Sequence, residues 1–114
     1  MTEGDVALAV LPQVDQRAKR RPVLVLRQMP GHQDVLVCGI STQLQHRIIG
    51  FDEVISPGDL DFKQSGLLTE SLIRLGFLAV LPPGRIAGSI GTVSPERHRR
   101  LLKALARYLT GDFG

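Results

Sequence analysis

The 114-residue sequence has no tryptophan, one tyrosine and one cysteine. A single cysteine, Cys38, cannot form an intrachain disulfide, which excludes a disulfide-stapled secreted scaffold and indicates a reducing compartment. Apolar runs such as Val6–Leu11 and Phe77–Leu81 are far shorter than the roughly 20 residues that a membrane-spanning helix needs. No basic and apolar leader of the signal-peptide type opens the sequence. We therefore expect a soluble, cytoplasmic protein with no membrane partner.

The motifs of common enzyme classes are also absent. The sequence contains neither a P-loop nor a dinucleotide-binding fingerprint. Its three histidines (His32, His46 and His98) and Cys38 lack the spacing of metal ligands, and its acidic residues are not paired as in a two-metal nuclease. We expect no metal and no cofactor. Any catalysis would then depend on arginine, hydroxyl groups and histidine.

Positive charge is present but unevenly distributed. The net charge is +3 and the isoelectric point is near 9.6, while the segment 48–62 contains four acidic residues and no lysine or arginine. Clustered cations favour a polyanionic partner because they displace counterions from phosphates, although solvated basic surfaces of no special role look the same in a sequence. The two basic clusters are Arg17, Lys19, Arg20, Arg21 and Arg27, and Arg97, Arg99, Arg100, Lys103 and Arg107.

Short apolar segments separated by turn residues predict a mainly β domain that spans residues 1–114. A polar and basic stretch, Gln13–Arg20, reads as an exposed loop, and Pro30-Gly31 is a turn signal between two strands expected to form a hairpin. The expected strands are Val6–Leu11, Pro22–Arg27, Asp34–Ser41, Ile48–Ile55, Ser71–Leu81 (one or two strands around Gly76) and Ile86–Val93.

The C-terminal segment predicts the one clear helix. Ser94 is a candidate N-cap, Pro95 suits the first helical position and Glu96 suits the positive end of the helix dipole. Leucines at helical spacing from Leu101 to Leu109 form one apolar face, with most of the basic residues outside it, and Gly111 is a plausible stop. Strands followed by an amphipathic helix indicate a small β-barrel or half-barrel with a packed helix.

Three places in the sequence carry candidate chemistry. Arg21 stands at the start of the expected second strand, where a guanidinium could hold a phosphate through two contacts. Ser41 and Thr42 end the third strand, which the hairpin would bring near Arg21, and their hydroxyls could orient a phosphate. Arg74 lies in an apolar strand, in opposite phase to its neighbours. A solvated cation or a strand-capping hydroxyl remains an alternative at each place.

An ordered set of segments along essentially the whole chain resembles the MazF/PemK family of toxins from type II toxin–antitoxin systems, in its PemK-like branch. No single segment is very specific, but their order is. The segments are Gly4–Val6, Lys19–Leu26, Ser41–Gln43, Gly66–Leu68, Ser71–Leu75 and Ile90–Glu96.

This resemblance implies a fold and an activity. The fold would be the SH3-like barrel of MazF, PemK and CcdB-type toxins with a C-terminal helix, forming a homodimer with an RNA groove between the subunits. The activity would be metal-independent, sequence-specific cleavage of single-stranded RNA, an mRNA interferase activity in which the ribose 2′-hydroxyl attacks the phosphodiester. A cognate antitoxin would block the groove, and the toxin–antitoxin complex would bind its own promoter DNA.

The resemblance also implies roles for individual residues. Arg21 would stabilise charge and donate a proton, Ser41 or Thr42 would orient the phosphate, and Arg74 would act on the phosphate as a strand arginine. The Gln13–Arg20 loop would close over RNA. The residues expected to bind RNA are Arg17, Lys19, Arg20, Gln43 and His46.

Two departures from the family pattern keep other functions open. Several members carry an aspartate two residues after the strand arginine, where this chain has Gly76, and the only aromatic candidates near the groove are Phe51 and Phe77. A non-catalytic nucleic-acid-binding module therefore remains an alternative. A CcdB-like gyrase inhibitor is a more distant one, because that class relies on a C-terminal tryptophan that this sequence lacks.

Overall fold

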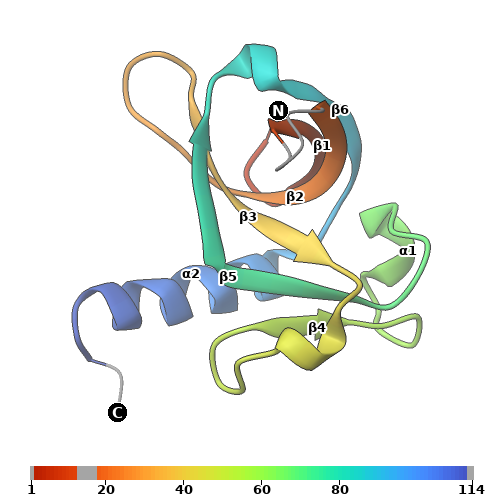
Figure 1. The fold of residues 1–114 in the computed structure, drawn as a ribbon. Coiled ribbons are helices and arrows are strands. Elements are labelled where there is room, and N and C mark those ends of the chain that lie inside the picture. The colour runs from red at the N-terminus through yellow and green to blue at the C-terminus, as the bar shows by residue number, and fades with distance from the viewer. Residues whose placement is uncertain (1, 13–17, 113–114) are drawn as a thin grey trace.

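The computed structural model of the protein describes residues 2–12 and 18–112. In these residues six antiparallel strands form one sheet in the order β4-β5-β3-β2-β1-β6, curled but not closed, with β4 and β6 at its edges (Figure 1). The expectation of a mainly β fold with a C-terminal helix is thus confirmed. The elements are β1 (Asp5–Pro12), β2 (Ala18–Gln28), β3 (Val35–Ser41), η1 (Leu44–His46), β4 (Glu53–Ile55), α1 (Phe62–Ser65), β5 (Ser71–Leu81), η2 (Pro83–Arg85), β6 (Ile86–Thr92) and α2 (Pro95–Leu109).

Strand β2 begins four residues earlier than the sequence predicts. The ladder with β1 extends to Pro12, which lies opposite Ala18, so part of the expected Gln13–Arg20 loop is strand. Backbone pairing with a neighbouring strand thus outweighs the polar character of Lys19 and Arg20. Arg21 consequently lies inside β2, opposite Ala9, and not at the start of the strand. The rest of that loop, residues 13–17 with Arg17, lies outside the described residues.

Strand β4 is much shorter than the expected Ile48–Ile55, because its first half forms a turn. The backbone carbonyl of Ile48 accepts hydrogen bonds from the N–H groups of Phe51, at 3.1 Å, and Asp52, at 2.9 Å. The buried Asp52 carboxylate then accepts from the N–H groups of Ile48, at 2.8 Å, and of Leu75 in β5, at 3.0 Å. A carboxylate therefore replaces the strand pairing that the sequence suggests here.

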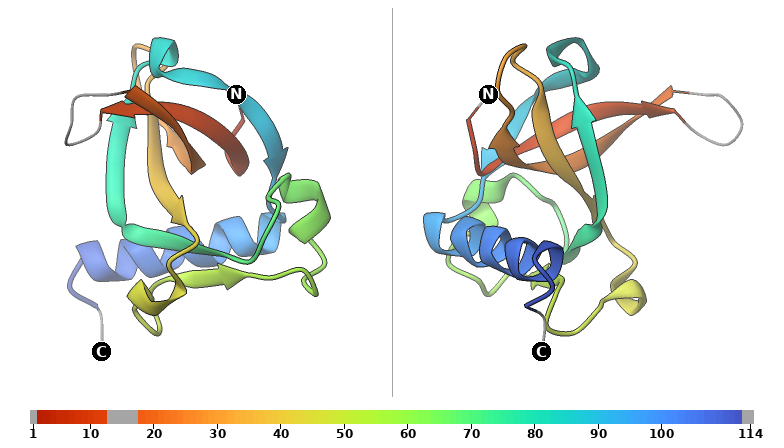
Figure 2. Two further views of the ribbon diagram at one scale, coloured as in Figure 1. Left: turned by 45° about the vertical axis from the view of Figure 1, so that its right-hand side comes forward. Right: turned by 90° about the vertical axis from the view of Figure 1, so that its left-hand side faces the viewer.

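The two faces of the sheet bury separate apolar cores. Residues alternate between the faces along each strand, so opposite partners in a ladder share a face. One core packs against α2, which lies across the sheet in all three views (Figure 1 and Figure 2), and the other fills the concave side of the curl. The α2-side core includes Val6, Leu24, Leu26, Cys38, Ile40, Ile73, Leu75, Leu101 and Leu105; the concave core includes Ala7, Ala9, Val23, Val25, Val35, Val37 and Leu81.

Helix α2 begins and ends where the sequence predicts. The Ser94 side chain accepts a hydrogen bond from the Arg97 N–H at 3.1 Å, Pro95 is the first helical residue, and Gly111 beyond the helix has a φ of 78°. The apolar face of the helix buries Leu101 and Leu105. Neither α-helix in the described part of the chain has the length and apolar content that crossing a bilayer requires.

The short helix α1, which the sequence does not predict, packs directly on the backbone of β6. A Cβ atom on Gly66, at the end of α1, would lie 2.1 Å from the carbonyl oxygen of Ile90. A Cβ atom on Gly91, in β6, would lie 2.2 Å from the carbonyl oxygen of Gln64. Gly66 also has a φ of 77°, which favours glycine. Only hydrogen fits at either position, so the two backbones are in direct contact.

Candidate nucleic-acid interface

Arg21 projects from the concave face of the sheet, in the part of β2 that extends beyond its pairing with β3. The β2–β3 ladder ends at the pair Val23 and Gly39, and Arg21 is two residues beyond Val23, so the two share a face. Val23 belongs to the concave core. The Arg21 side chain is exposed and forms no hydrogen bond or ion pair with the described residues. A guanidinium that no described residue pairs with thus stands at the rim of this core.

Ser41 lies on the same face, across from Arg21. It is two residues beyond Gly39 in β3, so continuing the register of the last ladder pair places Ser41 opposite Arg21. Its Oγ accepts a hydrogen bond from the Gln43 N–H at 3.0 Å, and no described residue accepts the Ser41 hydroxyl proton. That proton is therefore available to a bound anion.

Arg74 lies on β5, the strand next to β3, and projects from the same face of the sheet. It pairs directly with Gly39, so Val23, Gly39 and Arg74 form a row across β2, β3 and β5. Two strand spacings separate the outer members of such a row by roughly 10 Å, which long arginine side chains can bridge. Arg74 is half-buried and forms no hydrogen bond or ion pair with the described residues. Three groups singled out in the sequence thus share one face.

The other predicted residues surround this face unevenly. Lys19 is in phase with Arg21, whereas Arg20 projects from the opposite face of β2, and both are exposed. Thr42 and Gln43 follow β3 and are exposed, and His46 is exposed in η1. The side chain of Gln43 accepts a hydrogen bond from Gln45 at 2.7 Å. Arg17 lies outside the described residues.

One arginine of the C-terminal basic cluster is buried, although the sequence places it with the solvated ones. Arg97 donates from Nε to Asp61 at 2.8 Å and from Nη1 to Glu53 at 2.9 Å, and it has a third ion pair with Asp59 at 3.0 Å. These contacts join α2 to β4 and to the acidic segment between β4 and α1. No periodicity signals this role, because the partners are about 40 residues away in the sequence.

The pKa values of this cluster follow from its contacts. Burial alone would raise the pKa of the Asp61 carboxyl, but hydrogen bonds from Arg97 and the Ser94 N–H, with the charge of Arg97, lower it below its ordinary value. Burial likewise disfavours charge on Arg97, yet the hydrogen bond and charge of Asp61 raise its pKa. Both groups therefore stay ionised, and the cluster is a structural tie.

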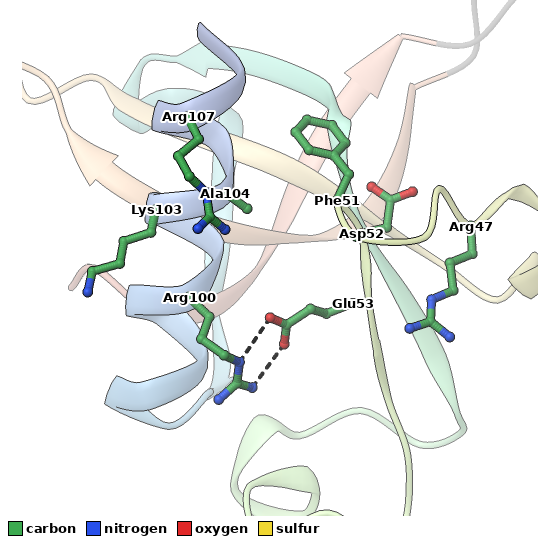
Figure 3. A pocket seen from close by; sticks show the side chains of 9 residues that line it. Arg47, Phe51, Asp52, Glu53, Arg100, Lys103, Ala104 and Arg107 are labelled. Carbon is green, nitrogen blue, oxygen red and sulfur yellow. Dashed lines mark hydrogen bonds and ion pairs between the residues drawn. The ribbon is translucent and has the colours of Figure 1, made fainter. Parts of the chain in front are cut away.

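A basic pocket lies on the other side of the sheet, between α2 and the turn that precedes β4 (Figure 3). Its volume is about 360 Å³. Glu53 is already paired with Arg100, at 3.0 Å, while Arg47, Lys103 and Arg107 have no ion pair in the described residues. The full lining is Arg47, Gly50, Phe51, Asp52, Glu53, Arg100, Lys103, Ala104 and Arg107. The chain thus has two basic surfaces on opposite faces of the sheet.

Among residues 2–12 and 18–112, no three histidine, cysteine or acidic side chains are grouped closely enough to hold a metal ion. Cys38 is buried in the α2-side core, and burial, with the nearby charge of Asp52, raises the pKa of its thiol to about 12. A protonated, enclosed thiol is a poor nucleophile. The chemical groups that the described residues offer on the concave face around Arg21 are therefore guanidinium, hydroxyl and the ammonium of Lys19.

The sequence matches a family model over residues 2–109, that of the PemK-like, MazF-like toxin of type II toxin–antitoxin systems. No curated protein matches the sequence significantly. Solved structures do match its fold. The Mycobacterium tuberculosis toxin MazF-mt6 gives a TM-score of 0.69 at 21% identity, covering 93% of this chain and 96% of that chain.

Two further solved structures are similar. An endoribonuclease from a mycobacterial species, in complex with its cognate antitoxin, gives a TM-score of 0.66 at 19% identity over 96% of this chain and 95% of that one. An endoribonuclease from a mycobacterial species gives 0.68 at 18% identity, over 96% and 91%. At such identities the likeness is one of fold. Because the family model covers nearly the whole chain, the protein belongs to the PemK-like, MazF-like toxins of type II toxin–antitoxin systems.

Proposed function

We propose that the protein is a metal-independent, sequence-specific endoribonuclease, which cleaves single-stranded RNA through attack of a ribose 2′-hydroxyl on the adjacent phosphodiester. The observation that carries this proposal is the sharing of one face by Arg21, Ser41 and Arg74, each with donor groups that no described residue uses. Endoribonucleases among the proteins of similar fold support it.

In the proposed reaction a bond forms between the 2′-oxygen and phosphorus, and the bond to the 5′-oxygen breaks. The 2′-hydroxyl releases its proton to solvent water, and the departing 5′-oxygen takes up one proton. The products are a 2′,3′-cyclic phosphate and a 5′-hydroxyl. Negative charge grows on the phosphoryl oxygens, and Arg21 and Arg74 stabilise it by charge-assisted hydrogen bonds. The Ser41 hydroxyl, held by the Gln43 N–H, donates to the same oxygens, with Thr42 beside it. Arg21 also donates to the departing oxygen.

The remaining polar residues around this face would hold the RNA strand. Lys19, Gln43 and His46 are exposed and lie within five residues of Arg21 or Ser41 in the sequence. Arg17 belongs to the same basic segment, as does Arg20, although Arg20 projects from the opposite face of β2. Phosphate contacts of this kind depend strongly on salt. Affinity for RNA should therefore fall as ionic strength rises.

The protein would act as a homodimer. Leu78 and Val80 of β5 lie opposite Cys38 and Leu36 and are 41% and 51% exposed. Tyr108 and Leu109 at the end of α2 are exposed as well, and both views of Figure 2 show the C-terminal half of the helix near the bend of β5. Monomers rarely expose contiguous apolar patches. Sedimentation analysis should give a dimer, and Val80→Asp should give a monomer.

A cognate antitoxin is the expected partner and inhibitor, as supported by the family and by the mycobacterial endoribonuclease solved with its own antitoxin. We further propose that the complex binds its promoter DNA, and that the single toxin domain, residues 1–114, acts in the cytoplasm.

The deciding experiment incubates purified protein with a long RNA in the presence of EDTA and maps the ends. We expect discrete cuts that survive chelation, leave cyclic phosphates and disappear in Arg21→Ala. Lys63→Ala, which removes an exposed cation in α1, is the matched control and should cut normally.

The same experiment tests the second candidate, a nucleic-acid-binding module without turnover. Gly76 favours it, because no acid stands there to assist proton transfer. If the protein shifts RNA bands in a gel but produces no new RNA ends, the result would indicate binding without cleavage. Gyrase inhibition without RNA cleavage would select the CcdB-like alternative.

A further inference from the structure

Phe77 lies in the irregular part of β5, where the strand bends past β3. Arg74 pairs with Gly39 and Leu78 pairs with Cys38, so three residues of β5 bulge out between adjacent partners on β3. The Phe77 ring returns over β3 within this bulge. A Cβ atom on Gly39 would lie 2.9 Å from Cδ1 of Phe77 and 3.2 Å from its Cγ. The ring therefore covers Gly39 on the side from which a side chain would project.

That side is the concave face, so the ring lies within the candidate site. Gly39 is the middle member of the row that joins Val23 to Arg74, and Ser41 is the next residue of β3 on this face. The ring consequently lies between the strand that carries Arg21 and the strand position of Arg74. An aromatic surface thus stands over β3, the strand between those that carry the two arginines assigned to the phosphate.

Phe77 also differs from the other described phenylalanines in its packing. Of the three phenylalanines in the described residues, Phe51 and Phe62 pack against the α2-side core, whereas Phe77 belongs to neither core and is 48% exposed. Single exposed apolar side chains are common, so exposure alone assigns nothing. An exposed ring beside Arg21 and Arg74, which no described residue pairs with, does indicate a function. Sites for single-stranded nucleic acid combine a cationic groove with aromatic stacking surfaces.

We propose that Phe77 stacks against a base of the bound RNA, next to the phosphate held by Arg21 and Arg74. This inference rests on the proposed ribonuclease function and adds the surface that positions the base. Stacking does not depend on hydrogen-bond patterns, so Phe77 fixes where a base lies, and other residues select which base it is.

Gly39 has a defined role in this arrangement. No positive φ is found at this residue, so alanine suits its backbone, but the new methyl group would displace the Phe77 ring. Because a ring on the surface can move at little cost, Gly39→Ala should lower RNA affinity while leaving the fold intact. This variant perturbs the stacking surface without altering Phe77 or any cation.

The test uses a mixed-sequence oligonucleotide with 2′-O-methyl groups, which remove the attacking hydroxyl, and with 5-iodouracil bases. We expect Phe77→Leu to weaken binding roughly ten- to one-hundredfold, Gly39→Ala to weaken it in the same direction, and Phe77→Tyr to restore it. Irradiation should crosslink the base to Phe77, as located by mass spectrometry. Phe51, which lines the pocket on the opposite face, is the control ring and should not crosslink.

Three outcomes would contradict the proposed stacking role of Phe77. If wild-type protein cuts RNA but Phe77→Leu binds it normally, the stacking inference fails and the ribonuclease proposal stands. If Phe77→Leu changes the oligomeric state in sedimentation, the ring belongs to a subunit interface and the inference fails. If wild-type protein neither binds nor cuts RNA, both fail together.

Discussion

Arg97 donates to both carboxylate oxygens of Asp61, from Nε at 2.8 Å and from Nη2 at 3.1 Å. Because both residues are buried, this two-pronged contact fastens the first turn of α2 to the segment before α1. Removing one partner of a buried pair leaves the other charge without compensation. Replacing only one of the two residues should therefore lower the stability of the fold strongly.

Replacing Arg97 by methionine keeps most of the apolar stem and removes the charge. We expect Arg97→Met to lower the free energy of unfolding by about 3–5 kcal/mol, measured by urea denaturation. Arg100→Ala is the control, since its pair with Glu53 is largely exposed and should cost roughly 0–1 kcal/mol. Equal losses in both variants would contradict a special role for the buried contact.

The lowered pKa of Asp61 predicts the response to acid. A carboxyl whose pKa is lower in the folded state contributes stability above its unfolded pKa of roughly 3.9, and that stability disappears as pH falls through the folded value. The urea midpoint should accordingly drop below about pH 4. Asp61→Asn should be less stable at neutral pH and show a shallower acid slope. Asp112→Asn, at an exposed carboxylate, should keep the wild-type slope.

The buried Cys38 thiol, with its pKa raised to about 12, predicts slow alkylation of the native protein. Iodoacetamide at pH 8 should label the protein in urea much faster than in buffer, as followed by mass spectrometry. The raised pKa also means that its contribution to stability is complete below the unfolded value of roughly 8.5 and is lost as pH rises toward 12. Rapid labelling without denaturant would show that the core around Cys38 opens.

Arg74 should matter to cleavage much more than an equally charged residue on the opposite face. We expect Arg74→Ala to reduce the rate of RNA cleavage by about a hundred- to a thousandfold, the usual effect of removing one donor that stabilises developing charge. Arg47→Ala, in the pocket beside α2, should leave the rate close to the wild-type value. Similar losses in the two variants would indicate general electrostatic attraction.

The sequence predicts those elements whose signals are local. Ser94, Pro95 and Gly111 mark the ends of α2 because capping depends on residues within one helical turn. The strands around Val23 and Ile73 are recognisable for the same reason, since each is a short apolar run that the local sequence itself shows. Features that depend on distant partners are not recognisable, which is why β2 begins earlier than expected and Arg97 is buried.

Some residues of the candidate site are also predictable from the sequence, and others are not. Arg21 and Ser41 can be grouped from the sequence because a hairpin brings their strands together. Arg74 joins them in the sequence only through the family resemblance, because the pairing of β5 with β3 is not predicted. The bulge that carries Phe77 over Gly39 cannot be anticipated, because its three extra residues appear only when β5 is aligned against β3. The sequence therefore names Phe77 as one of two aromatic candidates, and the structure is needed to separate it from Phe51.

The close backbone packing at Gly66 and Gly91 has a consequence for mutational surveys. A library of variants screened for loss of toxicity should find both positions intolerant of every other residue, including alanine, although neither is among the residues assigned to RNA. The cause would be collision of two backbones, with carbonyl oxygens only 2.1 Å and 2.2 Å from any added carbon. Intolerance to substitution in this protein thus measures available space as well as chemistry.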